Sequence, residues 1–176
     1  MPYIHLTRQW VRDVVVGCGF CPFAAHVYDR HLIRYRVAAA DEDLEELVVE
    51  EAEWLDEHTE TDTTLIIVPD RLDDFDTYLD ELENVQAALD REDYEGIYQL
   101  ASFHPEYRFE GSPENDVANY TNRSPFPMFH LLREESIDTA LDHYKGDPEA
   151  IPERNIRFAR EKGHAFFLDI LSRLGK

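Results

Sequence analysis

Positive charge is scarce in this sequence. It contains 17 lysines and arginines against 38 aspartates and glutamates, which gives a formal net charge of −21 at pH 7. No lysine or arginine occurs between Arg36 and Arg71. Such a surface repels the phosphates of nucleic acids and of anionic lipids, so we exclude both as partners. We interpret the acidity as a solvated surface suited to the salt-rich cytoplasm of a halophile, where screening weakens self-repulsion.

Long apolar stretches are also absent. No run of about 18 apolar residues is present, so we expect no membrane-spanning helix. The first ten residues, MPYIHLTRQW, carry charges and lack the apolar core of a signal peptide. We therefore expect a cytoplasmic protein whose thiols stay reduced. The length of 176 residues suits a single domain spanning residues 1–176.

Hydrophobic periodicity predicts an α/β fold. We expect a short, mainly parallel three-stranded sheet in β-α-β-α-β order, flanked by helices and followed by a helical C-terminus. Residues 104–127 are predicted to form a long irregular loop, a kind of segment that is usually functional or disordered. The predicted strands span 31–37, 63–68 and 97–103, and the predicted helices span 5–16, 41–56, 75–89, 128–135, 137–144 and 152–174.

Cysteine is rare as well, and both thiols lie in the stretch GCGFCPFAAH, at Cys18 and Cys21. A redox pair usually opens a helix directly after a strand, whereas this pair follows a predicted helix. A zinc site would need histidines as further ligands, because no other cysteine is present. Pro22 favours an extended conformation at Cys21, which lets its thiol face a cleft. We interpret Cys18 as structural, and Cys21 as structural, reactive or metal-binding.

Polar residues follow the predicted strands, at the edge where open parallel sheets bind ligands. His104 comes directly after the third strand and suits proton transfer near neutral pH, or is simply hydrogen-bonded in a turn. In the loop that follows, Asp116, Asn119 and Asn122 either bond their own backbone in turns or contribute to a site.

The loop ends in a pattern typical of a helix start. Ser124 resembles an N-cap and Pro125 a first-turn proline. Free N–H groups there, together with Arg123, would form a binding site for a carboxylate or phosphate. The alternative for Arg123 is a buried ion pair.

Three polar residues follow on the predicted helix 128–135. His130, Arg133 and Glu134 are spaced i, i+3 and i+4, so on a helix they would share one face. Glu134 would then orient the imidazole of His130, and Arg133 would bind an acidic substrate. A surface salt bridge is the alternative explanation for Arg133.

Several of these blocks are familiar: CPFA (21–24), ASFHPEYRFEG (101–111), NYTNRSP (119–125), HLLRE (130–134) and IPERN (151–155). Over nearly its whole length the chain resembles an uncharacterised bacterial family, catalogued as a domain of unknown function. The family pattern is similar to GLNLCPFA, so Cys21 matches it and Cys18 departs from it. The resemblance therefore implies that a dithiol is not required, and it implies no activity or cofactor.

We expect a small-molecule enzyme acting on an anionic metabolite, with a polar site built from Cys21, His104, Arg123 and His130. Cys21 would be the nucleophile and one histidine its base, or Cys21, His104 and His130 would hold a metal ion that activates water. Two alternatives remain: a non-enzymatic binding or regulatory module for an anionic ligand, and a protein–protein adaptor acting through the acidic segment 41–58. The sequence indicates no particular cofactor or oligomeric state.

Overall fold

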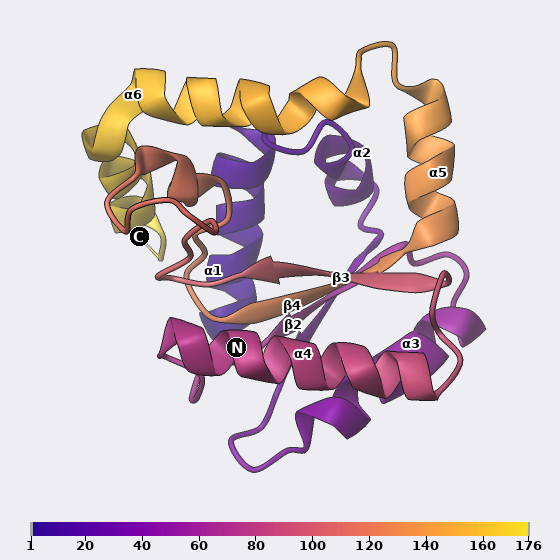
Figure 1. Ribbon diagram of the computed structural model, residues 1–176. Helices are drawn as coiled ribbons and strands as arrows, with labels where there is room; N and C mark the ends of the chain where they lie inside the picture. The colour runs from indigo at the N-terminus through magenta and orange to yellow at the C-terminus, as the bar shows by residue number, and fades with distance from the viewer. Residues whose placement is uncertain (1, 176) are drawn as a thin grey trace.

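A four-stranded mixed sheet with helices on both faces organises the chain (Figure 1). The computed structural model describes residues 2–175. The strands are β1 (Ile33–Val37), β2 (Thr63–Ile67), β3 (Tyr98–Phe103) and β4 (Met128–Arg133). The helices are α1 (Pro2–Trp10), α2 (Ala24–Asp29), α3 (Leu44–Glu57), α4 (Phe75–Arg91), α5 (Glu134–His143) and α6 (Ile151–Arg173), with a π-helical segment η1 (Val11–Val16) and 3₁₀ segments η2 (Val117–Thr121) and η3 (Pro148–Ala150).

The strand order in the sheet is β1-β2-β4-β3. Strands β1 and β2 are parallel, and β4 is antiparallel to both of its neighbours, β2 and β3. The α/β class is thus confirmed. The predicted three-stranded, mainly parallel β-α-β-α-β sheet is wrong, because a fourth strand inserts between the second and the third.

The predicted helix over 128–135 is the source of this error, since MFHLLR forms the inner strand β4. Met and Leu favour helices locally, but two flanking strands offer ladder hydrogen bonds on both sides of the segment, and tertiary pairing outweighs propensity. His130 lies directly opposite Leu65 of β2 and Ala101 of β3. Arg133 ends the strand, and α5 begins at Glu134, earlier than the predicted 137. His130, Arg133 and Glu134 therefore do not share a helix face.

Each face of the sheet has its own hydrophobic core. Helices α3 and α4 cover one face, where Phe129 and Leu131 of β4 are buried. Both helices begin at an aspartate, Asp43 and Asp74, whose carboxylate accepts hydrogen bonds from the first free N–H groups. Segments from α1, η1, η2 and α6 pack on the opposite face, around Met128.

The remaining boundaries differ from the prediction in detail. The first helix begins at Pro2 and continues as η1 to Val16, and α6 is interrupted at Gly163, whose φ of 75° is the left-handed conformation that glycine tolerates. The loop 104–127 contains η2. Among residues 2–175, no helix combines the length and the apolar character needed to cross a membrane.

Candidate functional site

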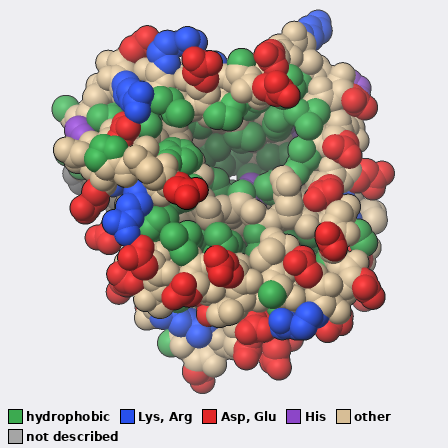
Figure 2. Space-filling model, viewed as in Figure 1, with side chains coloured by type: hydrophobic (Ala, Val, Ile, Leu, Met, Phe, Trp, Pro, Cys, Tyr) green, Lys and Arg blue, Asp and Glu red, His purple; other side chains and the backbone are tan. Residues whose placement is uncertain are grey.

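A deep hollow opens on the face of the sheet opposite α3 and α4 (Figure 2). In the common view of Figures 1 and 2, α6 lies above it, α1 on the left, α5 on the right and β3 below, and α2 appears between α6 and β3. Hydrophobic side chains line most of it, and a histidine is visible inside. His130 and Leu132 of β4 and Ala101 of β3 lie on this same face of the sheet and are partly exposed. We name this concavity the hollow and take these three residues as its floor.

Side-chain exposure along β4 shows why the floor is open. Phe129 and Leu131, on the α3/α4 face, are 1% and 0% exposed, whereas His130 and Leu132 on the opposite face are partly exposed. Met128 is buried beneath α1, but the cover ends before His130. Helix α5 lies beside the sheet without burying any residue of its own. The residue opposite His130 on β3 is Ala101, whose methyl group is too small to cover the imidazole.

The hydrogen bonds of His130 fix its tautomer. The Thr63 hydroxyl donates its single proton to the Leu131 carbonyl at 2.6 Å, and Nε2 of His130 lies 2.7 Å from the same hydroxyl oxygen. Nε2 must therefore be the donor. In the neutral ring this leaves Nδ1 as an unprotonated acceptor, and no residue of the described chain bonds it. Among the described residues, the buried side-chain polar atoms that lack a hydrogen-bond partner do not include Nδ1 of His130. Because Nδ1 has no partner either, it is accessible to solvent, in line with the partial exposure of His130.

Burial lowers the pKa of His130 to about 4. The ring lies deep within surrounding protein atoms, which disfavours the charged form. Near neutral pH, His130 is therefore a neutral imidazole with a free lone pair on Nδ1.

His104 occupies a different environment and is fully buried. Its Nε2 lies 2.8 Å from the Leu72 carbonyl, and its Nδ1 accepts from the Glu106 N–H at 3.0 Å. The ring packs against Phe75 and Tyr78 of α4. Burial lowers the pKa of His104, so it stays neutral with both nitrogens already bonded. This arrangement matches the turn-binding alternative and leaves no atom for proton transfer.

The predicted anion-binding residues bond their own loop. Arg123 donates to the Tyr107 and Glu114 carbonyls at 3.2 and 2.8 Å. The buried Asn119 side chain accepts from the Phe109 N–H and donates to two backbone carbonyls. No helix begins at Ser124, so the expected cluster of free N–H groups does not exist there.

Four further candidates also have structural partners. The Ser124 hydroxyl donates to the Phe126 carbonyl, and Asn122 donates to the Ser102 carbonyl. Asp116 caps η2 and pairs with Arg160 of α6. Arg133 donates to the Leu55 carbonyl at 2.5 Å, at the end of α3. Glu134 has no side-chain contact with His130, whose ring is held by Thr63 instead.

Cys21 lies at the turn into α2. The N–H groups of Phe23 and Ala24 and the charge of Arg154 favour its thiolate, but burial has the larger effect and raises the pKa of the Cys21 thiol. Burial also raises the pKa of Cys18, and the two thiols are not joined. No hydrogen bond connects Cys21 to either histidine, and within residues 2–175 no three potential metal ligands come together.

A family model described as Protein of unknown function (DUF1415) matches residues 2–169. The chain belongs to the DUF1415 family. No curated protein matches the chain, and no solved structure matches it either. The family resemblance of the sequence is thereby confirmed.

In this DUF1415 chain, the IPERN block holds the cysteine-bearing turn. Arg154 donates to the Gly19 carbonyl at 2.5 Å, and Asn155 donates to the Phe20 carbonyl at 2.7 Å. Gly19 has a φ of 67°, which suits a residue without a side chain. These contacts tie the start of α6 to the turn before α2, so they fix one border of the hollow.

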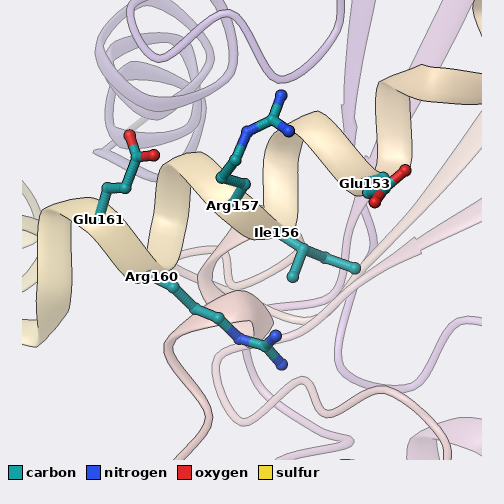
Figure 3. A pocket seen from close by; sticks show the side chains of 5 residues that line it. All are labelled: Glu153, Ile156, Arg157, Arg160 and Glu161. Carbon is teal, nitrogen blue, oxygen red and sulfur yellow. The ribbon is translucent and has the colours of Figure 1, made fainter.

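A separate depression of the DUF1415 chain runs along α6 (Figure 3). Arg157 and Arg160 point to opposite sides of the helix in this view, and Arg160 is already paired with Asp116. A single helix surface without converging side chains does not form a binding site. The residues lining the depression are Glu153, Ile156, Arg157, Arg160 and Glu161.

We expect the thiols of this DUF1415 protein to react slowly. Because burial raises the pKa of both Cys18 and Cys21, little thiolate exists at neutral pH. Alkylation by iodoacetamide at pH 7.5, followed by mass spectrometry of Cys18→Ser and Cys21→Ser variants, should be slower for each remaining thiol than for a free cysteine peptide. A faster reaction of Cys21 than of the peptide would restore the reactive-thiol hypothesis.

Thr63 and Ala101 of the site are missed by sequence reasoning. Thr63 begins the apolar run TTLIIV and is one of two threonines in that inner strand. Ala101 is a small residue in the third strand. Only the pairing of both strands with β4 reveals that these two residues adjoin His130.

Proposed function

We propose that this protein binds a small molecule in the hollow, with Nδ1 of His130 as the polar contact. The observation that carries this proposal is an unpaired imidazole acceptor on an inner strand, reached from a concave and mostly apolar surface. Ligand sites are typically apolar concavities that contain a few well-placed polar groups. Thr63 supports the proposal because it holds the ring in one tautomer before a ligand arrives.

The same geometry favours binding over the Cys–His catalysis expected from the sequence. A base with a pKa of about 4 has little driving force to take a proton near neutral pH. The Cys21 thiol has a raised pKa and no hydrogen bond to a histidine. We therefore propose a binding protein, in which His130 orients the ligand without exchanging a proton with it.

The acidic surface supports a proposal about environment rather than activity. Several carboxylates of α3 serve the fold: Glu51 pairs with Arg34, and Asp56 accepts hydrogen bonds from Tyr94 and Tyr98. These contacts do not favour the adaptor hypothesis. We propose that the remaining acidic groups keep the protein dispersed in a salt-rich cytoplasm and away from nucleic acids.

A ligand screen by thermal shift tests the proposed function, because a ligand that binds the native state raises its melting temperature. We expect hits to stabilise the wild-type protein and to lose their effect in Ala101→Ile, which places a branched side chain over His130. The matched control is Ala87→Ile, at an exposed position on α4 beyond the sheet. If a hit raises the melting temperature of Ala101→Ile as much as that of Ala87→Ile, its binding site lies outside the hollow.

A further inference from the structure

The floor of the hollow carries no formal charge. Burial alone sets the pKa of His130, and no charged side chain contributes to its shift. The two arginines nearest in sequence are occupied elsewhere. Arg133 bonds the end of α3 across the sheet, and Arg123 bonds carbonyls of its own loop. At the floor itself, none of the three residues is charged, and neither of these arginines offers a counter-charge.

This absence of charge selects the class of ligand. An anion at the floor would lose its hydration without gaining a cation, which costs several kcal/mol. The net charge of −21 would repel it further. A cation would also be desolvated, with one neutral acceptor as its only polar partner. An uncharged molecule avoids both costs.

The acceptor at Nδ1 defines the polar group that the ligand must present. Since Nε2 donates to Thr63, Nδ1 can only accept, and a ligand carbonyl or ether oxygen would leave it unpaired. The neighbouring floor residues, Ala101 and Leu132, are apolar and partly exposed, so they favour an apolar body.

We infer that the hollow binds an uncharged, mainly apolar molecule that donates one hydrogen bond, from a hydroxyl or N–H group, to Nδ1 of His130. This inference rests on the proposed function and departs from the anionic ligand expected from the sequence. It gives His130 the role of selecting the ligand by its donor group.

Three probes of matched size test this inference on the full chain: phenol, toluene and benzoate. Binding is followed by NMR, through the methyl shifts of Ala101 and Leu132 and the imidazole nitrogen shifts of His130. We expect phenol to bind about fivefold more tightly than toluene, because a net hydrogen bond contributes roughly that factor. Benzoate should bind most weakly. In His130→Phe, toluene should still bind, and the advantage of phenol over toluene should disappear.

Other results would overturn the inference in distinguishable ways. Tighter binding of benzoate than of phenol would show an anion site, and an unchanged phenol-to-toluene ratio in His130→Phe would show that Nδ1 does not select the ligand. If none of the probes shifts the floor resonances, the proposed binding function itself fails, and the inference fails with it. If His130→Phe does not fold, His130→Leu replaces it in the comparison of phenol with toluene. The pH-dependent nitrogen shifts of the wild-type imidazole then provide a second measurement of the same contact.

Discussion

Replacing Leu131 by alanine should lower the free energy of unfolding by about 3 kcal/mol, because it leaves a cavity in a closed core. Leu131 is 0% exposed and belongs to the core beneath α3 and α4. Leu132→Ala, at the next residue, should cost only about 1 kcal/mol, since Leu132 is partly exposed on the floor of the hollow. Urea denaturation monitored by circular dichroism measures both.

This pair of variants tests the register of β4, because both remove the same atoms from the same strand. A strand alternates its side chains between two faces, so a slip of one residue would exchange the two results. A larger loss for Leu132→Ala would place His130 in the α3/α4 core and remove it from the hollow.

Replacing Glu51 by alanine should lower the free energy of unfolding by about 2 kcal/mol, because it removes a buried carboxylate that accepts two charge-assisted hydrogen bonds from the partly exposed Arg34. Glu51 is 3% exposed and accepts from Arg34 at 2.6 and 3.1 Å, and Arg36 approaches it to 3.6 Å. Without the carboxylate, Arg34 loses its ion-pair partner, whereas Arg36 keeps its pairing with Glu42. Chemical denaturation of the variant measures this loss.

Glu50→Ala is the matched control, because Glu50 is the preceding residue of α3 and is exposed. A substitution at such a position should change stability by no more than about 0.5 kcal/mol. Equal effects at the two positions would mean that Glu51 does not join α3 to β1.

The sequence predicts the locally encoded elements well. The amphipathic pattern of Leu44–Glu57 and the β-branched run at Thr63–Ile67 produce a helix and a buried strand where expected. The inner strand β4 could not be predicted in the same way. Its six residues favour a helix locally, and the partners that make it a strand lie at least 25 residues away in sequence, at Tyr98–Phe103 and Thr63–Ile67.

The candidate site shows the same limit. His130 is singled out by the sequence for its spacing to Arg133 and Glu134, yet the group that holds its ring is Thr63, 67 residues away. In the NYTNRSP block, asparagine and arginine suit either a ligand or a loop, because both uses need the same hydrogen-bonding groups. Only the observed contacts of Asn119 and Arg123 show that they bond the loop.

The most direct test is a pH titration of His130 by nitrogen NMR of its imidazole in the full-length protein. Near neutral pH, we predict that Nε2 carries the proton and that Nδ1 is unprotonated, with a midpoint near pH 4. Since the unfolded ring takes up a proton at about pH 6.5, the free energy of unfolding should fall as the pH decreases from about 6.5 to about 4, and less so in His130→Phe. A midpoint near 6.5, or a proton on Nδ1 at neutral pH, would contradict the presence of a free acceptor in the hollow.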